Sequence, residues 1–137
     1  MEKKFKKDVG SLEAIDSHIR SFAAENDLDD ATIFTLNFVV EEIFTNMVKY
    51  QPQSGRDVLL DLSRDGNTLK VTLTDYGVEY FDPTAAPPVD TGRPLSERRP
   101  GGLGVHLVKT FVDTFDYRYV DNNSVITLTK NLKDEHV

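Results

Sequence analysis

A carboxylate and an amide stand four residues apart in a segment of helical periodicity, at Glu42 and Asn46. Four residues make about one helical turn, so both side chains point the same way. They fall where the polar arc of the helix meets its apolar arc, and from there both can face a cleft. A carboxylate can take the proton of an attacking hydroxyl, and an amide oxygen can ligate a hard cation. Taken alone, two solvated surface residues are the simpler explanation.

A third polar group, Asp75, ends an alternating apolar segment and is followed two positions later by Gly77. An ionised carboxylate only accepts hydrogen bonds, so at a strand end it can receive one from an exocyclic amine such as that of adenine. Gly77 leaves room for a flat base to approach the backbone. Taken alone, an ordinary aspartate at a turn explains the pattern more simply.

Three glycines, Gly101, Gly102 and Gly104, directly precede an apolar-periodic segment in RPGGLGVH. Backbone amides at a helix N-terminus, unobstructed by side chains, can bind phosphate. The run is not a Walker A loop, because Gly-Lys-Ser/Thr is absent, and it does not open a strand-helix-strand unit as a Rossmann fingerprint does. A flexible loop with a glycine-rich helix entrance is the alternative explanation.

The elements that must position these residues follow from the spacing of the apolar side chains. Helical spacing predicts helices over residues 11–26, from 29 or 30 to before Pro52, and over 103–112. Ser11 is the predicted N-cap of the first helix. Alternation predicts strands over residues 58–62, 69–73, 115–119 and 125–132, with turns at 65–67 and 121–123 and a candidate edge strand at 5–9. Two hairpins separated by a helix indicate an α+β fold, a two-layer sandwich whose mixed, mostly antiparallel sheet carries about three helices on one face.

Between the second hairpin arm and the third helix lies a long segment without periodicity, residues 76–102, which holds most of the prolines. Compact domains rarely keep such a loop unless it is functional. A length of 137 residues indicates one domain, residues 1–137.

Composition excludes several classes of protein. The net charge is −7 and the sequence pI is about 4.9, so nucleic acid is not an expected partner. The chain has no cysteine, which removes disulfides, thiol nucleophiles and cysteine-ligated metals and fits a reducing cytoplasm. No apolar run approaches about 18 residues, and the charged first residues are not followed by a signal core. We therefore expect a cytoplasmic protein that binds neither nucleic acid nor membrane.

In combination, the three patterns in this order, with the proline-rich loop before the last, resemble the N, G1 and G2 boxes of the Bergerat-fold (GHKL) ATPases. The segments FVVEEIFTNMVKY, TDYGVEYFDP and RRPGGLGVHLVKTFVD look like those of the stand-alone anti-sigma factor serine kinases of bacterial partner-switching systems. The resemblance covers residues 11–132, nearly the whole chain.

The resemblance implies a role for each motif. Asn46 would ligate Mg²⁺ beside ATP or ADP, and Glu42 would be the general base. Asp75 would accept a hydrogen bond from the adenine amino group, and Gly77 would shape the base pocket. An ATP lid would cover about residues 80–102. The cofactor-binding hinge at its end would consist of Gly101, Gly102, Leu103, Gly104 and Val105.

The resemblance also implies an activity, the phosphorylation of a serine on a small STAS-domain anti-anti-sigma antagonist. Members of the group often bind a sigma factor and form homodimers. The alternative is a nucleotide-dependent protein-binding module, an anti-sigma regulator with little or no kinase turnover. An isolated histidine-kinase catalytic domain fits less well, because the sequence shows no dimerisation helix with a phosphoacceptor histidine.

The sequence departs from the family pattern at two places. G1 usually reads Asp-x-Gly-x-x-Phe-Asp, and here one extra residue separates Asp75 from Phe81 and Asp82, which puts the start of the lid in doubt. Tyr50 stands where the group often has histidine, and we assign it no role. Two arginines near the end of the lid, residues 98 and 99, are most simply explained as solvated charges.

Overall fold

The computed structural model describes residues 1–50, 57–77 and 102–132. Strand β1 (Glu2–Phe5) leads through a short 3-10 helix (Val9–Ser11) into α1 (Leu12–Glu25) and α2 (Asp30–Tyr50). A first hairpin follows, made of β2 (Val58–Asp65) and β3 (Thr68–Asp75). Helix α3 (Gly102–Phe111) then precedes a second hairpin, made of β4 (Thr114–Val120) and β5 (Asn123–Asn131).

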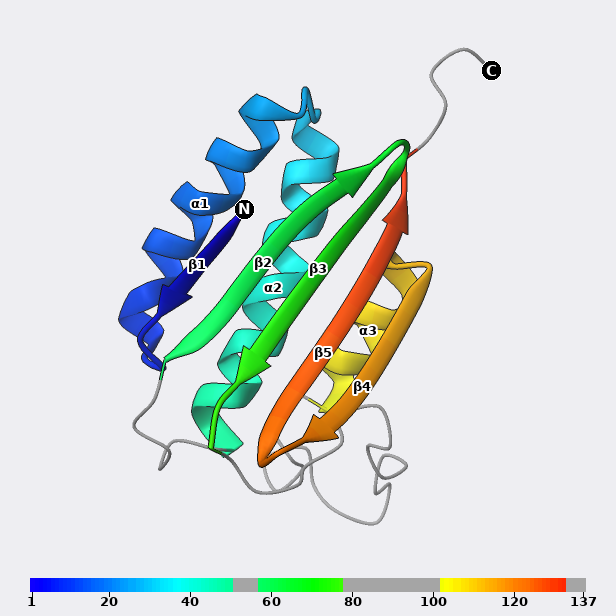
Figure 1. Ribbon diagram of the computed structural model, residues 1–137. Coiled ribbons are helices and arrows are strands. Elements are labelled where there is room, and N and C mark those ends of the chain that lie inside the picture. The colour runs from blue at the N-terminus through cyan, green and yellow to red at the C-terminus, as the bar shows by residue number, and fades with distance from the viewer. Residues whose placement is uncertain (51–56, 78–101, 133–137) are drawn as a thin grey trace.

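The five strands form one sheet in the order β1-β2-β3-β5-β4. Figure 1 shows the three helices together on one face of this sheet. The expected α+β two-layer sandwich is therefore confirmed. The sheet was expected to be mixed, but every strand pairing in the described part of the chain is antiparallel. Tight turns make the two hairpins antiparallel, and the hairpins also pair antiparallel through β3 and β5.

Both hairpin turns use residues that tolerate a left-handed backbone. Gly66 has a φ of +59°, and Asp121 and Asn122 have φ values of +53° and +65°. Two consecutive left-handed residues match the right-handed twist of the flanking strands, which explains the Asp-Asn pair between β4 and β5. Both turns lie where the sequence predicts them.

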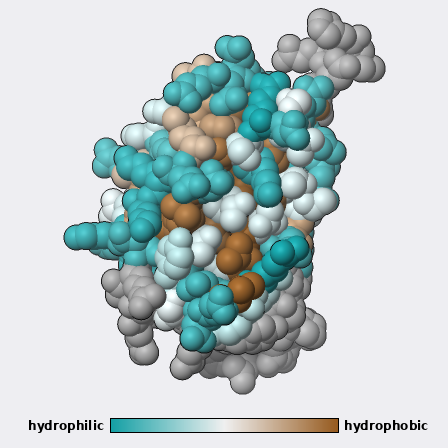
Figure 2. All heavy atoms as spheres, in the orientation of Figure 1, coloured by the Kyte–Doolittle hydropathy of each residue, from teal (hydrophilic) through white to brown (hydrophobic). Residues whose placement is uncertain are grey.

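The core lies between the sheet and the helices. Its residues come from every second position of the strands and from one face of each helix. Alternate residues of β2 and β3 point toward the helices and are fully buried, as Leu60 and Leu73 are. The helices supply Ile15, Ile19 and Phe44, each with no exposed surface. The opposite face of the sheet has no covering layer among the described elements. Figure 2 views the molecule from this side and shows hydrophobic groups scattered among neutral and hydrophilic ones.

The start of the chain differs from the prediction. The edge strand covers Glu2–Phe5 rather than residues 5–9, and the chain then turns tightly before α1. Ser11 occupies the N-cap position, but its hydroxyl donates to the carbonyl of Lys6 at 2.8 Å instead of accepting from a helix amide. The serine therefore closes the turn and does not cap the helix.

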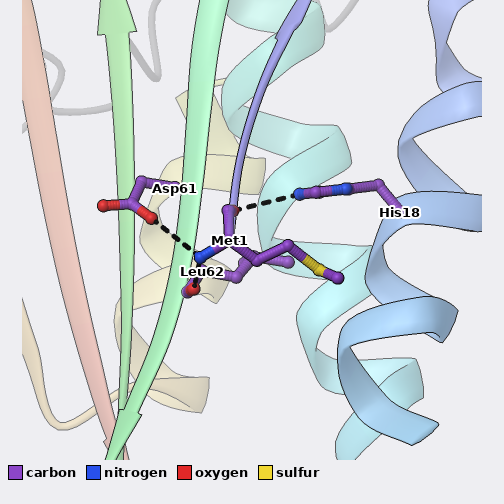
Figure 3. A network of polar contacts seen from close by, with 4 residues as sticks. All are labelled: Met1, His18, Asp61 and Leu62. Carbon is purple, nitrogen blue, oxygen red and sulfur yellow. Dashed lines mark hydrogen bonds and ion pairs between the residues drawn. The ribbon is translucent and has the colours of Figure 1, made fainter. Parts of the chain in front are cut away.

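Polar contacts join the beginning of β1 to β2 and α1 (Figure 3). The Met1 ammonium donates to the carbonyl of Leu62 at 2.7 Å and lies 3.4 Å from Oδ1 of Asp61. The carbonyl of Met1 lies 3.1 Å from Nε2 of His18 on α1. These contacts fix the register of β1, so that its last residue, Phe5, lies opposite the first residue of β2.

Helix α2 is the longest element, and it begins at a side-chain cap. The amide of Thr32 donates to Oδ1 of Asp29 at 2.8 Å, so Asp29 caps the helix, at one of the two positions predicted for its start. The helix ends at Tyr50, before Pro52 as expected. Of the helices in the described part of the chain, none is long and apolar enough to span a membrane.

Candidate functional site

The candidate residues gather at one end of the sandwich. Helix α2 ends there, β3 ends there, and α3 begins there, as Figure 1 shows at the lower edge of the view. The helices α2 and α3 run in opposite directions, which brings the C-terminal turns of one beside the N-terminus of the other. Three motifs that are far apart in sequence thus share one end of the fold.

Asn46 and Glu42 occupy the C-terminal half of α2. The Asn46 residue is only 7% exposed, whereas Glu42 is half-buried one turn earlier. Their neighbours Ile43 and Met47 are core residues, so the amide and the carboxylate lie at the border of the buried face. Burying an amide is costly unless it is hydrogen-bonded, so a polar residue at this border is unusual among the apolar neighbours. The predicted arrangement on one helix face is what the structure contains.

Asp75 is the last residue of β3, and its side chain is 1% exposed. Nζ of Lys7 lies 2.5 Å from its Oδ1, and the Lys7 side chain is itself 3% exposed. The two groups form a buried ion pair. Burial raises the pKa of Asp75 above its ordinary value, and the Lys7 ammonium opposes that rise.

Gly77 lies two residues after Asp75 and has a φ of +63°, a backbone conformation that residues other than glycine rarely adopt. Its amide donates to Oδ1 of Asn123 at 3.1 Å. Asn123 begins β5, and its neighbour Ser124 lies opposite Asp75 in the register. The second hairpin therefore holds the backbone just beyond Asp75. The positive φ at position 77 explains why a glycine stands there.

The third motif opens α3. The helix begins at Gly102, so Leu103, Gly104 and Val105 form its first turn. The first amides of a helix have no intrahelical partner and can receive an anion. Gly101 and the expected lid through residue 101 lie outside the described residues.

Two residues of this end were not singled out in the sequence, namely Lys7 and Asn123. Lys7 is one of four lysines in MEKKFKKD, and composition does not distinguish it from the others. One signal was available. Lys7 follows the buried Phe5 by two positions, and in extended backbone such residues face the same side. Asn123 is of a residue type common in turns, and nothing else in the sequence points to a role at this end of the fold.

Comparison with known proteins agrees with this geometry. A family model described as the histidine kinase-like ATPase domain matches residues 5–130. The chain belongs to this family. The predicted relationship to the Bergerat-fold superfamily and its serine kinase group is confirmed.

Relatives of this histidine kinase-like ATPase domain include named kinases. The serine/threonine-protein kinase BtrW of Bordetella bronchiseptica is 30% identical over 104 residues, which cover 74% of this chain and 72% of the relative. The serine-protein kinase RsbW of Halalkalibacterium halodurans is 28% identical over 116 residues, covering 82% and 67%. RsbW of Staphylococcus aureus is 27% identical over 126 residues, covering 86% and 74%.

Among solved structures, the RsbU and RsbW domains of Rv1364c from Mycobacterium tuberculosis superpose with a TM-score of 0.68. The match covers 96% of this chain and 31% of that longer chain, at 13% sequence identity. This likeness shows the fold, a histidine kinase-like ATPase sandwich.

Proposed function

We propose that this chain binds ATP with Mg²⁺ at the shared end of α2, β3 and α3, and transfers the γ-phosphoryl group to a serine of a STAS-domain antagonist. The observation that carries the proposal is the placement of Glu42 and Asn46 on one turn of α2, at the end of the fold where Asp75 and the N-terminus of α3 lie. The family match and the kinase names of the relatives support it.

Asp75 and Gly77 fit an adenine base. An ionised carboxylate at the end of a buried strand accepts a hydrogen bond from the 6-amino group. Gly77 presents backbone without a side chain beside it, so that a planar ring can come close. Lys7 contacts one oxygen of Asp75, and a carboxylate has a second oxygen with which to accept.

Asn46 fits a magnesium ion that is held largely by phosphates. Mg²⁺ requires oxygen ligands, keeps several waters and takes only one or two of its ligands from protein in such sites. The buried amide of Asn46 offers one oxygen near the helix N-terminus of α3, whose amides can hold phosphate. When bound, the ion would neutralise the charge that develops on the phosphates.

Glu42 is placed to act as the general base. Its half-buried carboxylate lies one helical turn from Asn46 and on the same side of α2. In the proposed reaction the serine oxygen attacks the γ-phosphorus, the bond to the β-γ bridging oxygen breaks, and ADP leaves. Glu42 takes or orients the serine proton.

The activity is tested by incubating the chain with γ-labelled ATP, Mg²⁺ and a candidate STAS protein, and then assaying for phosphoserine. The decisive variant is Glu42→Gln, and the matched control is Glu41→Gln, an equally half-buried carboxylate on the same helix. We expect transfer to fall at least about a hundredfold in Glu42→Gln and to persist in Glu41→Gln. Equal activity in both variants would remove Glu42 from the mechanism.

The second candidate is the protein-binding module, in which bound nucleotide selects a partner without turnover. Tight ATP binding with no phosphoserine on the STAS protein would favour it. A sigma factor and a second copy of the chain are further proposed partners, and cytoplasm is the proposed location. Pull-down of each partner in the presence of ATP or ADP separates these cases.

A further inference from the structure

We propose that Lys7 determines the base specificity of this site by keeping the Asp75 carboxylate in the form that only accepts hydrogen bonds. Asp75 then binds the 6-amino group of adenine and rejects the 6-oxo group of other purines. This inference rests on the proposed function. It adds a positioning residue, which acts on the base through Asp75 and does not contact the nucleotide.

The burial of the pair carries the first step. A lysine side chain that is 3% exposed has given up its hydration, and such burial is seldom tolerated unless the charge is paired. Here the partner is Oδ1 of Asp75 at 2.5 Å. The residues that flank Asp75 in the sheet, Val58 on β2 and Ser124 on β5, carry no charge. Among the described residues, Lys7 is the charged group that contacts this carboxylate.

The turn that follows β1 carries the second step, because it fixes the backbone of Lys7. The carbonyl of Lys6 accepts from the amide of Asp8 and from Oγ of Ser11, both at 2.8 Å. Asp8 in turn accepts from the amide of Ser11 at 2.9 Å and from the amide of Gly10 at 3.2 Å. These hydrogen bonds fix the backbone on both sides of Lys7, from which the buried side chain reaches Asp75.

The chemistry of the purine ring carries the third step. Adenine presents an amino group at position 6, which donates, whereas hypoxanthine and guanine present an oxygen there, which accepts. A carboxylate can bind only the donor, but a protonated carboxyl can also donate to the oxygen. A buried carboxyl without a cation takes up a proton at higher pH than an exposed one. Removal of the Lys7 charge would therefore let Asp75 bind purines with either a 6-amino or a 6-oxo group.

The test measures dissociation constants of ATP and inosine triphosphate by calorimetry with Mg²⁺, between pH 6 and pH 8. Three variants are compared with the wild type. Lys7→Met removes the charge at similar length, and Lys7→Arg keeps it. Lys6→Met is the matched control, since Lys6 is the neighbouring lysine and is exposed.

We expect Lys7→Met to weaken ATP binding roughly tenfold, the scale of one hydrogen bond to a charged group, and to lose most of the preference for ATP over inosine triphosphate. Both effects should grow toward pH 6, because protonation of Asp75 causes them. Lys7→Arg should retain the preference, and Lys6→Met should match the wild type. In the ligand-free wild type, the ¹³C resonance of the Asp75 carboxyl should show an ionised group from pH 6 to pH 8.

Several results would overturn the inference. One is a Lys7→Met protein with wild-type affinity and selectivity at every pH. Another is tighter ATP binding in that variant, which would mean that Lys7 competes with the base. If Lys7→Met does not fold, a wild-type Asp75 resonance that titrates between pH 6 and pH 8 is equally decisive against it. A wild type that binds no ATP refutes the proposed function itself, whereas ATP binding with an indifferent Lys7 refutes only this inference.

Discussion

Phe38 on α2 and Phe111 on α3 pack edge to face, with ring centroids 5.2 Å apart and ring planes at 61°. Because the helices run in opposite directions, this contact fixes what lies beside the start of α3. Gly102 precedes Phe111 by nine residues, and nine residues after Phe38 the chain reaches Met47. The N-terminus of α3 therefore lies beside the turn of α2 that carries Asn46, and the contact between the two phenylalanines sets this alignment.

Phe111→Ala should loosen α3 against α2. We expect unfolding free energy to fall by about 1 kcal/mol, since the ring is partly exposed and the pair interaction is of that size. ATP affinity should fall as well, because the helix N-terminus loses its fixed position. Urea unfolding and calorimetry measure the two effects. The matched control is Phe34→Ala, a phenylalanine of α2 that is 67% exposed, which should change neither quantity much. Equal behaviour of the two variants would contradict the positional argument.

Asn46→Ala should uncouple ATP binding from magnesium. In the wild type, removal of Mg²⁺ with a chelator should weaken ATP binding at least about tenfold. In Asn46→Ala the affinity with Mg²⁺ should drop toward the chelated value, because one of the few protein oxygens of the ion is lost. Asn37→Ala, an amide on the same helix nine residues earlier, serves as the control. Full magnesium dependence in Asn46→Ala would exclude Asn46 as a ligand.

Asp29 gives α2 a pH-dependent cap. Its pKa is lowered, first by the hydrogen bonds with Thr32. A depressed folded pKa means that the stability is complete above the unfolded value, about 3.9, and is lost as pH falls through the folded value. Asp29→Asn keeps the cap without the charge, so its stability should overtake that of the wild type as the pH falls below about 4. Asp29→Ala should be the less stable variant at every pH. Thermal unfolding between pH 2.5 and pH 7 checks both, and parallel wild-type and Asp29→Asn curves would count against the assignment.

Gly77→Ala should cost stability and binding together. A φ of +63° strains any residue with a β-carbon by about 1–2 kcal/mol. Relaxation of that strain would move the amide that Asn123 holds, and with it the backbone beside the proposed base. Gly10→Ala is the matched control, because its φ is not left-handed and a new β-carbon would meet Asp8 only at an ordinary 3.5 Å. A Gly77→Ala protein with unchanged stability would show that the backbone there adjusts freely.

The order of the elements could be predicted because apolar residues recur in each one at the spacing typical of a strand or a helix. Alternation in β2, β3 and β5 and the spacing along α2 are local properties, and the two turns carry residues that suit left-handed backbone. Boundaries and caps were less predictable. The strand at the start was placed too late, and Ser11 bonds a carbonyl instead of a helix amide. Both depend on tertiary contacts that local patterns do not contain.

The site could be predicted where its residues lie in short motifs. Glu42 with Asn46, Asp75 with Gly77 and the glycines before α3 are each visible within a few positions, although their roles are still predictions. The lysine beside Asp75 is separated from it by 68 positions of chain, and nothing local links a lysine near the start to an aspartate at a strand end. Only the pairing of β1 with β2, and of β2 with β3, brings them together.

The turn between β2 and β3 is a suitable site for attaching a fluorescent label. Asn67 is exposed there and lies eight residues before Asp75, roughly 26 Å along the strand. The chain has no cysteine, so a thiol introduced at Asn67 would be unique. A fluorophore attached at that thiol would report rotational diffusion, and hence capture by a larger partner, without touching the nucleotide.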